Sequence, residues 1–373
     1  MDFRLSEEQT LLKQSVERFL RDAYDFDTRQ KLVESGEVFS RDNCRTFAEL
    51  GWLGVGLPEA NGGFGGAAET MIVMEGFGAA LVVEPYLSTV VLGAGLIAAA
   101  GSAAQRRDLL PRVAAGDLML AVAFAEPQAR FNLADTRTAA SRHGGGWHLT
   151  GTKIAVLGGP SADAFIVSAR TAGAERDRDG ISLFLVEAGA VERRDYRTVD
   201  GLRASELTFD QISLSEDSLV GAVGEGLGAL EAVVDRAIAA IAAEAVGCMQ
   251  VLHDDTKEYL KTRKQFGAPL ARFQVLQHRM VDMFMELEQA RSVTLMATLQ
   301  LDAEPATRSR AAAKAKAYIG KAGPFVGAQA VQLHGGMGMT NELRIGHYYK
   351  RLMQIDTLFG NRDWHLKRLT ETV

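Results

Sequence analysis

The segment Gly146–Gly159, GWHLTGTKIAVLGG, decides the fold class because it follows the pattern of a β-strand in the middle of an otherwise helical chain. Its apolar and polar residues alternate between glycine-rich ends, which is typical of a strand with one buried face. Similar short runs occur at Leu118–Pro127, Asp163–Arg170 and Ile181–Glu187. The stretch from Leu118 to Leu219 is therefore predicted to be β-structure.

Helical periodicity flanks this β segment on both sides. Before about Gly116, apolar residues recur at steps of three and four. After Gly224 the chain is rich in Ala, Leu and Met and has helical periodicity over long segments. These segments are Leu227–Arg263, Phe273–Leu301 and Thr307–Leu333.

This order predicts an α+β fold that is mainly α. We expect an N-terminal helical domain at residues 1–117, a middle β-barrel-like domain at 118–222 and a C-terminal four-helix bundle at 223–373. A doubly wound nucleotide-binding fold would need strands and helices in alternation, and that alternation is missing.

Composition excludes several classes of function. The 41 basic and 47 acidic residues are interspersed and give a net charge of -6, so nucleic acid is not expected as a partner. The only cysteines, Cys44 and Cys248, are too far apart to suggest a disulfide framework or a zinc site. The seven histidines include no pair at ligand spacing beside a carboxylate, so no metal is expected. A cytoplasmic location fits this cysteine usage best.

The N-terminal residues do not resemble a secretion signal. Ser6 and Gln9 have capping-box spacing, which predicts a helix start at this point. The most apolar stretch, Tyr86–Ala100, has about 15 residues, fewer than the ~20 that a membrane-spanning helix needs. A buried helix is expected there, and no membrane span.

A glycine-rich segment, Gln332–Met339 (QLHGGMGM), offers backbone that a ligand could approach closely. Amide N–H groups with no Cβ in front of them suit an anion. The glycines do not stand between a strand and a helix in dinucleotide-fingerprint order, so a Rossmann site is not expected. The alternative is that they form a tight turn.

Several motifs, in order along essentially the whole chain, resemble the acyl-CoA dehydrogenase family. They are LGWLGVGLPEANGGFGG (Leu50–Gly66), FAEP (Phe124–Pro127), WHLTGTKIAVLGGPSADAFIVSAR (Trp147–Arg170), GLRASELTFDQISL (Gly201–Leu214), TRKQFGAPLARFQVLQHRMVDM (Thr262–Met283) and QLHGGMGMTNE (Gln332–Glu342). The resemblance implies an oxidoreductase with FAD, usually assembled as a tetramer of two dimers. It implies an acyl-CoA substrate, and an electron-transfer flavoprotein as the electron acceptor.

The resemblance also implies which residues face the cofactor. In the family these elements act across the dimer interface on the neighbouring subunit's FAD. Arg263 could neutralise the pyrophosphate, and the glycine backbone could lie against it. The alternative is that Arg263 caps a helix end and Phe266 belongs to the core. The expected cofactor-binding set is Arg263, Phe266, Gln274, Gln332, Gly335 and Gly336.

The catalytic base of the family is not where the resemblance places it. Family enzymes remove an α-proton with a Glu carboxylate while a β-hydride passes to the flavin. That Glu would fall between Phe359 and Asn361 or, in some members, at Ala237, and no acid stands at these positions. The nearest candidate is Asp235, two residues away and rotated roughly 200° around the helix. Its neighbour Arg236 is a candidate for contact with CoA.

Two aspartates flank the first of these positions. They are Asp356 and Asp363, and Asp363 could instead cap the last helix.

The subunit's own half of the flavin site is also altered. Ala125 and Phe131 stand where the family has hydroxyl side chains, Ala155 replaces the flavin-stacking Trp, and Leu157 replaces a Thr or Ser. Lys153 aligns with the family.

This asymmetry predicts a subunit of a heteromeric acyl-CoA dehydrogenase that lacks the usual Glu and pairs with a homologous Glu-bearing subunit. The alternatives are a self-sufficient homotetramer with a relocated base, a flavin-free structural homologue, and an oxidase or monooxygenase on the same fold. The acyl group is not indicated by the sequence.

Overall fold

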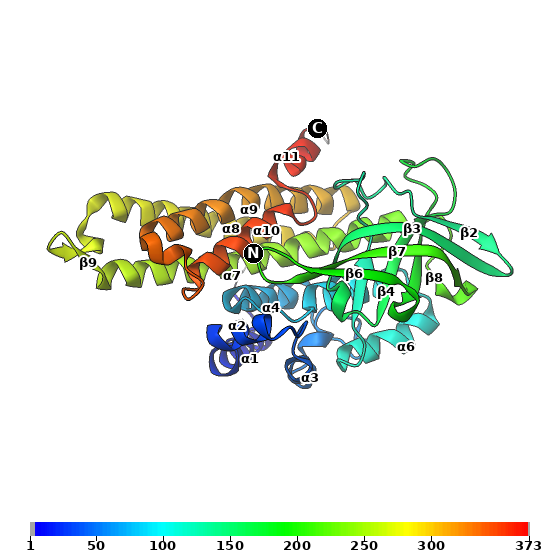
Figure 1. Ribbon diagram of the computed structural model, residues 1–373, viewed down its shortest axis with the longest axis horizontal. Coiled ribbons are helices and arrows are strands. Elements are labelled where there is room, and N and C mark those ends of the chain that lie inside the picture. Colours follow the sequence, from blue (N-terminus) through cyan, green and yellow to red (C-terminus); the bar gives the residue numbers. More distant parts are fainter. Residues whose placement is uncertain (1–3, 372–373) are drawn as a thin grey trace. The chain divides into compact units, whose positions relative to one another are not determined.

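The computed structural model describes residues 4–371 (Figure 1). The chain forms two compact units, here called the bundle unit and the sheet unit. The bundle unit comprises Met1–Lys31, Ala67–Val82 and Ile238–Val373, and the sheet unit comprises Leu32–Gly66 and Val83–Ala237. The predicted fold class is confirmed: helices come first, a sheet follows, and a helical bundle ends the chain.

The bundle unit is built on the long helices α7, α8 and α9 (Figure 1). The helices predicted for these segments are confirmed, with ends within two residues of the expected ones. The helices of this unit are α1 (Glu7–Ala23), α2 (Phe26–Ser35, up to Lys31), α4 (Ala67–Ala80), α7 (Gly226–Thr262, from Ile238), α8 (Gln274–Leu299), α9 (Pro305–His334), α10 (Ile345–Thr357) and α11 (Arg362–Glu371). A small hairpin of β9 (Lys264–Gln265) and β10 (Ala268–Pro269) connects α7 to α8.

Helix α1 begins with the predicted capping box. The Ser6 hydroxyl accepts a hydrogen bond from the Gln9 backbone N–H (3.1 Å), and the Gln9 side chain accepts one from the Ser6 N–H (3.0 Å). These bonds satisfy two backbone donors that a helix start leaves without partners.

Helices α4 and α7 touch at two glycines. A Cβ added at Gly78 would lie 1.9 Å from the backbone oxygen of Glu244, and one added at Gly247 would lie 2.0 Å from the backbone oxygen of Glu75. Only glycine leaves room for backbones this close. The Cys248 thiol, next to this contact, is buried and donates to the Gly78 carbonyl (3.2 Å).

A buried ion pair ties α7 to α10. Arg351 donates through Nε to Glu244 Oε1 (2.6 Å) and through Nη2 to Oε2 (2.7 Å), and each side chain is only 7% exposed. This two-pronged geometry fixes the helices in register as well as balancing the charges.

The sheet unit contains the predicted β-structure as one eight-stranded sheet with the order β6-β7-β3-β2-β4-β5-β8, in which β1 pairs with β4. Neighbours are mostly antiparallel, but β4 runs parallel to β1 and β2. The strands are β1 (Leu120–Ala123), β2 (Ala139–His143), β3 (Gly146–Leu157), β4 (Ala164–Arg170), β5 (Ile181–Glu187), β6 (Glu192–Arg197), β7 (Arg203–Leu214) and β8 (Leu219–Val220).

Large apolar side chains fill the core of the sheet unit. Trp147, Phe165, Phe184 and Phe209 belong to one buried cluster, and the Trp147 and Phe184 rings meet edge to face at 5.2 Å. The opening segment, now β3, buries Trp147, Leu149 and Val156 and exposes Thr150 and Thr152, and two irregularities in its pairing with β7 interrupt the alternation that its sequence predicts.

The α-helices that lie entirely in the sheet unit are α3 (Arg41–Glu49), α5 (Gly95–Ala100) and α6 (Ala103–Ala114). The buried helix expected at Tyr86–Ala100 is confirmed, although its first part, Leu87–Ala94, is a π-helix rather than an α-helix. Within residues 4–371, no helix combines the length and apolar character needed to cross a membrane.

Candidate functional site

The connection between α7 and α8 presents Arg263 and Phe266 to solvent. Phe266 and Gly267 occupy the hairpin turn with φ of 52° and 79°, the backbone that a two-residue turn between twisted strands requires. Phe266 is 90% exposed, so the alternative that it belongs to the core is excluded. The Arg263 backbone accepts a hydrogen bond from Leu270 N (2.9 Å), while its exposed guanidinium has no ion pair within residues 4–371.

Glycines follow the C-terminal end of α9, and their backbone is exposed to solvent. Gly335 has φ 63° and ψ -144°, a region that is essentially restricted to glycine. A Cβ built at Gly335 or at Gly336 would meet nothing within 4 Å. These glycines therefore shape the chain and leave its backbone accessible, rather than making room for a neighbouring part of the same chain.

The two parts of the predicted cofactor-binding set lie at the same end of the bundle unit. The Tyr259 ring, one turn before Arg263, stacks on His334 with the ring centroids 4.4 Å apart. Arg279 near the start of α8 donates to Gln329 near the end of α9 (3.3 Å).

The two glutamines of the predicted cofactor-binding set, Gln274 and Gln332, are exposed, and their side chains are not hydrogen-bonded within residues 4–371. Arg263, Gln274 and Gln332 therefore offer exposed hydrogen-bond donors that no group within residues 4–371 occupies.

Several large apolar side chains close in sequence to these polar residues are exposed as well. Val275 is 64% exposed, Met337 53% and Met339 74%, in addition to Phe266. Large apolar residues exposed together commonly mark a binding surface.

The positions expected to hold the family's base carry other roles. Ala237 is fully buried in α7, and its neighbour Asp235 is 3% exposed. The Asn361 side chain accepts a hydrogen bond from Trp364 N (3.0 Å), so Asn361 caps α11. The prediction that Asp363 could cap this helix is wrong, because Asp363 lies inside its first turn.

The loop that contains Phe359 and Gly360 is held in an unusual conformation, with φ of 56° and 107°. The Lys316 ammonium, buried in α9, donates to the backbone oxygens of Asp356 (2.8 Å) and Gly360 (2.6 Å). A left-handed non-glycine residue persists only where its surroundings enforce it, and Lys316 supplies part of that enforcement. Burial lowers the pKa of Lys316 to about 8, although the Asp356 carboxylate opposes the shift.

His365 supports the same loop from α11. It is fully buried, and its Nε2 lies 2.9 Å from the Phe359 carbonyl oxygen, to which a neutral ring donates. Burial, followed by repulsion from Lys316, lowers the pKa of His365 to about 3. The ring is therefore uncharged at neutral pH.

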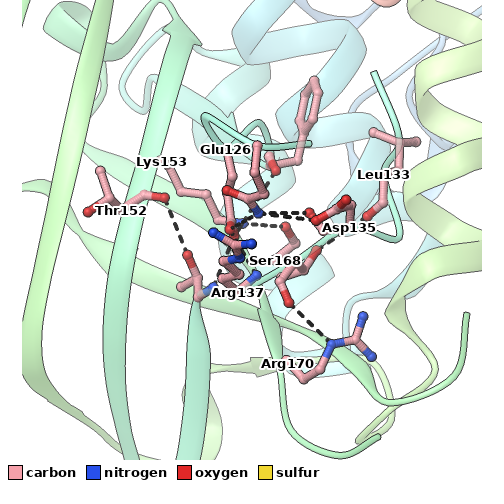
Figure 2. Close-up of polar contacts among 12 residues, drawn as sticks. Glu126, Leu133, Asp135, Arg137, Thr152, Lys153, Ser168 and Arg170 are labelled. Atoms are coloured by element: carbon pink, nitrogen blue, oxygen red, sulfur yellow. Dashed lines mark hydrogen bonds and ion pairs between the residues drawn. The ribbon is translucent and has the colours of Figure 1, made fainter. Parts of the chain in front are cut away.

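In the sheet unit, Lys153 and Glu126 form a buried polar network (Figure 2). The Lys153 ammonium donates to Glu126 Oε1 (2.7 Å) and Ser168 Oγ (3.1 Å). Glu126 also accepts hydrogen bonds from the backbone N–H groups of Arg137 (2.8 Å) and Thr138 (3.1 Å).

The network favours the charged form of Glu126. Burial alone would raise the pKa of Glu126, but the Lys153 charge and the hydrogen bonds from Lys153, Gln128 and Arg137 lower it to about 2. The carboxylate and the ammonium are both hydrogen-bonded, so this pair fixes the loop after β1 to β3 and is not poised for proton transfer.

The positions where the family's own flavin-facing side chains would stand carry small or apolar residues here. Ala155 is exposed at φ 52°, beside an irregularity in the pairing of β3 with β7, and Leu157 is half-buried. Methyl and isobutyl groups offer neither a ring to stack nor a hydroxyl to donate at these points.

The roles of Lys316 and His365 are not apparent in the sequence. Lys316 stands in the alanine-rich run Ala311–Ala317, where a lysine suggests a solvated helix face. Its acceptors lie 40 and 44 residues away, and no local pattern signals them. The acidic partner of Lys153, in contrast, stands in the FAEP motif.

Comparison with known proteins assigns all three parts of the chain to one family. Sequence profiles of the N-terminal, middle and C-terminal domains of acyl-CoA dehydrogenases match residues 6–117, 121–212 and 224–373. The mitochondrial long-chain specific acyl-CoA dehydrogenase of Sus scrofa is 30% identical, and the match covers 98% of this chain and 86% of that protein.

Two solved structures are similar over almost the whole chain. The ChsE4-ChsE5 complex from Mycobacterium tuberculosis contains a chain with 26% identity and a TM-score of 0.90, with 100% of this chain and 98% of that chain covered. A Tcur3481-Tcur3483 steroid ACAD variant contains one with 31% identity and a TM-score of 0.88, with 98% and 97% covered. The chain belongs to the acyl-CoA dehydrogenase family and is an oxidoreductase of the class that uses a flavin cofactor.

Proposed function

We propose that this chain completes the FAD site of a homologous, Glu-bearing subunit in a heteromeric acyl-CoA dehydrogenase. The observation that carries the proposal is the exposed Arg263, which forms no ion pair within residues 4–371, at the end of the bundle unit where the backbone of Gly335 and Gly336 is open. The expected base positions of the chain carry no acid.

The residues present fit the diphosphate part of FAD. The Arg263 guanidinium has donors for phosphate oxygens that no group in the described part of the chain occupies, and the Gly335 and Gly336 N–H groups can be approached closely. Gln274 and Gln332 have free amide groups for further hydrogen bonds. Bound FAD supplies the hydride-accepting chemistry of the family.

The other half of the reaction needs a group that this chain does not place. Removal of the acyl-CoA α-proton requires a base within hydrogen-bond reach of that proton. Phe359, Gly360 and Asn361 cannot accept it, so the partner subunit supplies the carboxylate. The similar ChsE4-ChsE5 complex supports such an assembly, and so does the paired name of the Tcur3481-Tcur3483 protein.

The assembly proposed is a tetramer in which each FAD lies between unlike subunits. We further propose that an electron-transfer flavoprotein accepts the electrons, as the family resemblance implies. We also propose a cytoplasmic location, because both cysteines are free thiols.

The test is the amount of FAD per chain, measured by visible absorbance on the protein purified alone and co-expressed with a Glu-bearing homologue. Little flavin alone, restored by co-expression, is the expected result. One flavin per chain in the protein alone, with dehydrogenase activity, would replace the proposal with a homotetramer that uses a relocated base, for which Asp235→Asn is the next variant. A co-expressed assembly without flavin would indicate a structural homologue.

Arg263→Ala is expected to weaken FAD binding by the co-expressed assembly about tenfold or more, because a charge-assisted contact contributes about 1.5–3 kcal/mol. The variant should therefore retain less flavin than the wild type after dialysis. Arg107→Ala is the matched control, since Arg107 is an exposed arginine on α6 in the sheet unit. Equal flavin content in the two variants would show that Arg263 does not bind the cofactor.

A further inference from the structure

A cavity of about 510 Å³ lies within the bundle unit among α1, α4, α7 and α8. Its size is in the range of small-molecule sites, about 300–1,000 Å³. Most of its wall is apolar, including Val16, Met71, Ile72 and Leu295. None of the predicted cofactor-binding residues lines it, so it is separate from the surface described above.

One buried hydroxyl in this wall lacks a protein partner. Thr294 is 2% exposed and lines the cavity, and its Oγ1 forms no hydrogen bond to any group in residues 4–371. Thr298, one turn further along α8, shows the usual arrangement, because its hydroxyl donates to the Thr294 backbone oxygen (2.9 Å). Buried hydroxyl groups are normally hydrogen-bonded, so the Thr294 hydroxyl is available to a ligand.

The charged groups of the wall are balanced. Arg291 donates to Glu75 Oε1 (2.6 Å) and to the Gln250 side chain (2.9 Å). The Lys13 Nζ lies 3.8 Å from Glu17 Oε1. The two basic side chains are thus paired with two carboxylates, so the cavity wall carries no net charge that would attract an ion.

We propose that this cavity binds an uncharged, mainly apolar molecule whose single hydroxyl or carbonyl oxygen pairs with the Thr294 hydroxyl. The apolar wall takes the hydrocarbon part, and the balanced charges disfavour a carboxylate or an amine. Thr294 then determines which apolar molecules bind well, because only one that carries an oxygen satisfies its hydroxyl.

The test compares 1-octanol with octane as probes of the full-length chain, using ligand-detected NMR for binding and thermal melting for stabilisation. We expect saturable binding of 1-octanol and a higher melting temperature, since a ligand of the folded state stabilises it. Thr294→Val should weaken 1-octanol binding about 3- to 12-fold, the effect of one hydrogen bond, and leave octane binding unchanged.

Thr298→Val is the matched control, because its hydroxyl is satisfied within α8, and it should leave 1-octanol binding unchanged. Ala79→Leu extends a side chain from the cavity wall and should abolish binding of both probes. The proposal is overturned if 1-octanol does not bind the wild-type chain saturably. Equal 1-octanol affinity of wild type and Thr294→Val, or binding that Ala79→Leu does not affect, would also overturn it.

Discussion

Lys153 and Lys316 are both fully buried, and the chain stabilises them in different ways. Lys153 meets a carboxylate, whereas Lys316 meets backbone oxygens at the end of α10 and in the loop after it. A buried charge is tolerated only when it is paired and hydrogen-bonded. Lys153 therefore depends on one acidic side chain, while Lys316 depends on the path of the loop around Phe359.

Glu126→Gln removes the charge that balances Lys153. Breaking a buried pair by loss of one partner costs about 3–5 kcal/mol of unfolding free energy. The matched control is Glu216→Gln, which breaks the exposed pair of Arg142 and Glu216 and should cost no more than about 1 kcal/mol. Urea denaturation of the three proteins measures both losses, and similar values would show that the Lys153 network is not a stability centre.

His365 is expected to make stability fall in mild acid. Its ring stays neutral in the folded chain down to about pH 3, but it binds a proton in the unfolded chain below about pH 6.5. Below pH 6.5 the unfolded state therefore holds more protons, and unfolding becomes easier as the pH falls. Between pH 6.5 and 5 the loss is about 2 kcal/mol.

His365→Gln keeps a donor for the Phe359 carbonyl but cannot titrate. Denaturation midpoints at pH 6.5 and pH 5 should therefore differ less in this variant than in the wild type. His278→Gln, which changes an exposed histidine of α8, serves as the control and should keep the wild-type dependence. An unchanged pH dependence in His365→Gln would contradict the assignment.

At the scale of elements, the contact between α4 and α7 depends on glycine. Gly247→Ala would place a methyl carbon 2.0 Å from the Glu75 backbone oxygen, so the helices must separate, at a cost of about 1–3 kcal/mol or more. Gly228→Ala in the same helix meets nothing within 4 Å and should stabilise by about 0.5–1 kcal/mol. Thermal melting should shift in opposite directions for the two variants, and shifts of the same sign would argue against this packing.

The long helices could be predicted because their signals are local. Periodicity and the turn residues around Gly267 and Pro305 set the limits of α7, α8 and α9 to within two residues. The π-helix at Leu87–Ala94 could not be predicted, since its apolar run has the same composition as a buried α-helix.

The candidate site also has features that the sequence indicates and features that only the folded structure reveals. Arg263 and the two glycines could be named as candidates because each stands in a short contiguous motif, at Thr262–Met283 and at Gln332–Glu342. The left-handed Phe359 and its support by Lys316 depend on residues that meet only after folding, so the sequence offers no sign of them. The capping role of Asn361 was missed because Asp363 competes as an equally good local candidate.

At the scale of the whole molecule, the proposed function requires a second subunit to cover the apolar side chains around Arg263. Phe266→Ser should reduce co-purification with a Glu-bearing homologue, because an aromatic residue that is 90% exposed becomes a small polar one. Val199→Ser changes a side chain that is 62% exposed in the sheet unit and should leave assembly intact. Size-exclusion chromatography of the co-expressed proteins measures this, and equal assembly of both variants would place the partner elsewhere.

Burial of both native cysteines has a practical consequence for labelling. Cys248 is sealed at the contact of α4 with α7, and burial in the sheet unit raises the pKa of Cys44, so neither thiol presents a reactive thiolate. A cysteine introduced at position 266 would be the one thiol that a maleimide dye reaches in the folded chain. Its fluorescence would then report, in real time, when another subunit or a flavin arrives at that end of the bundle.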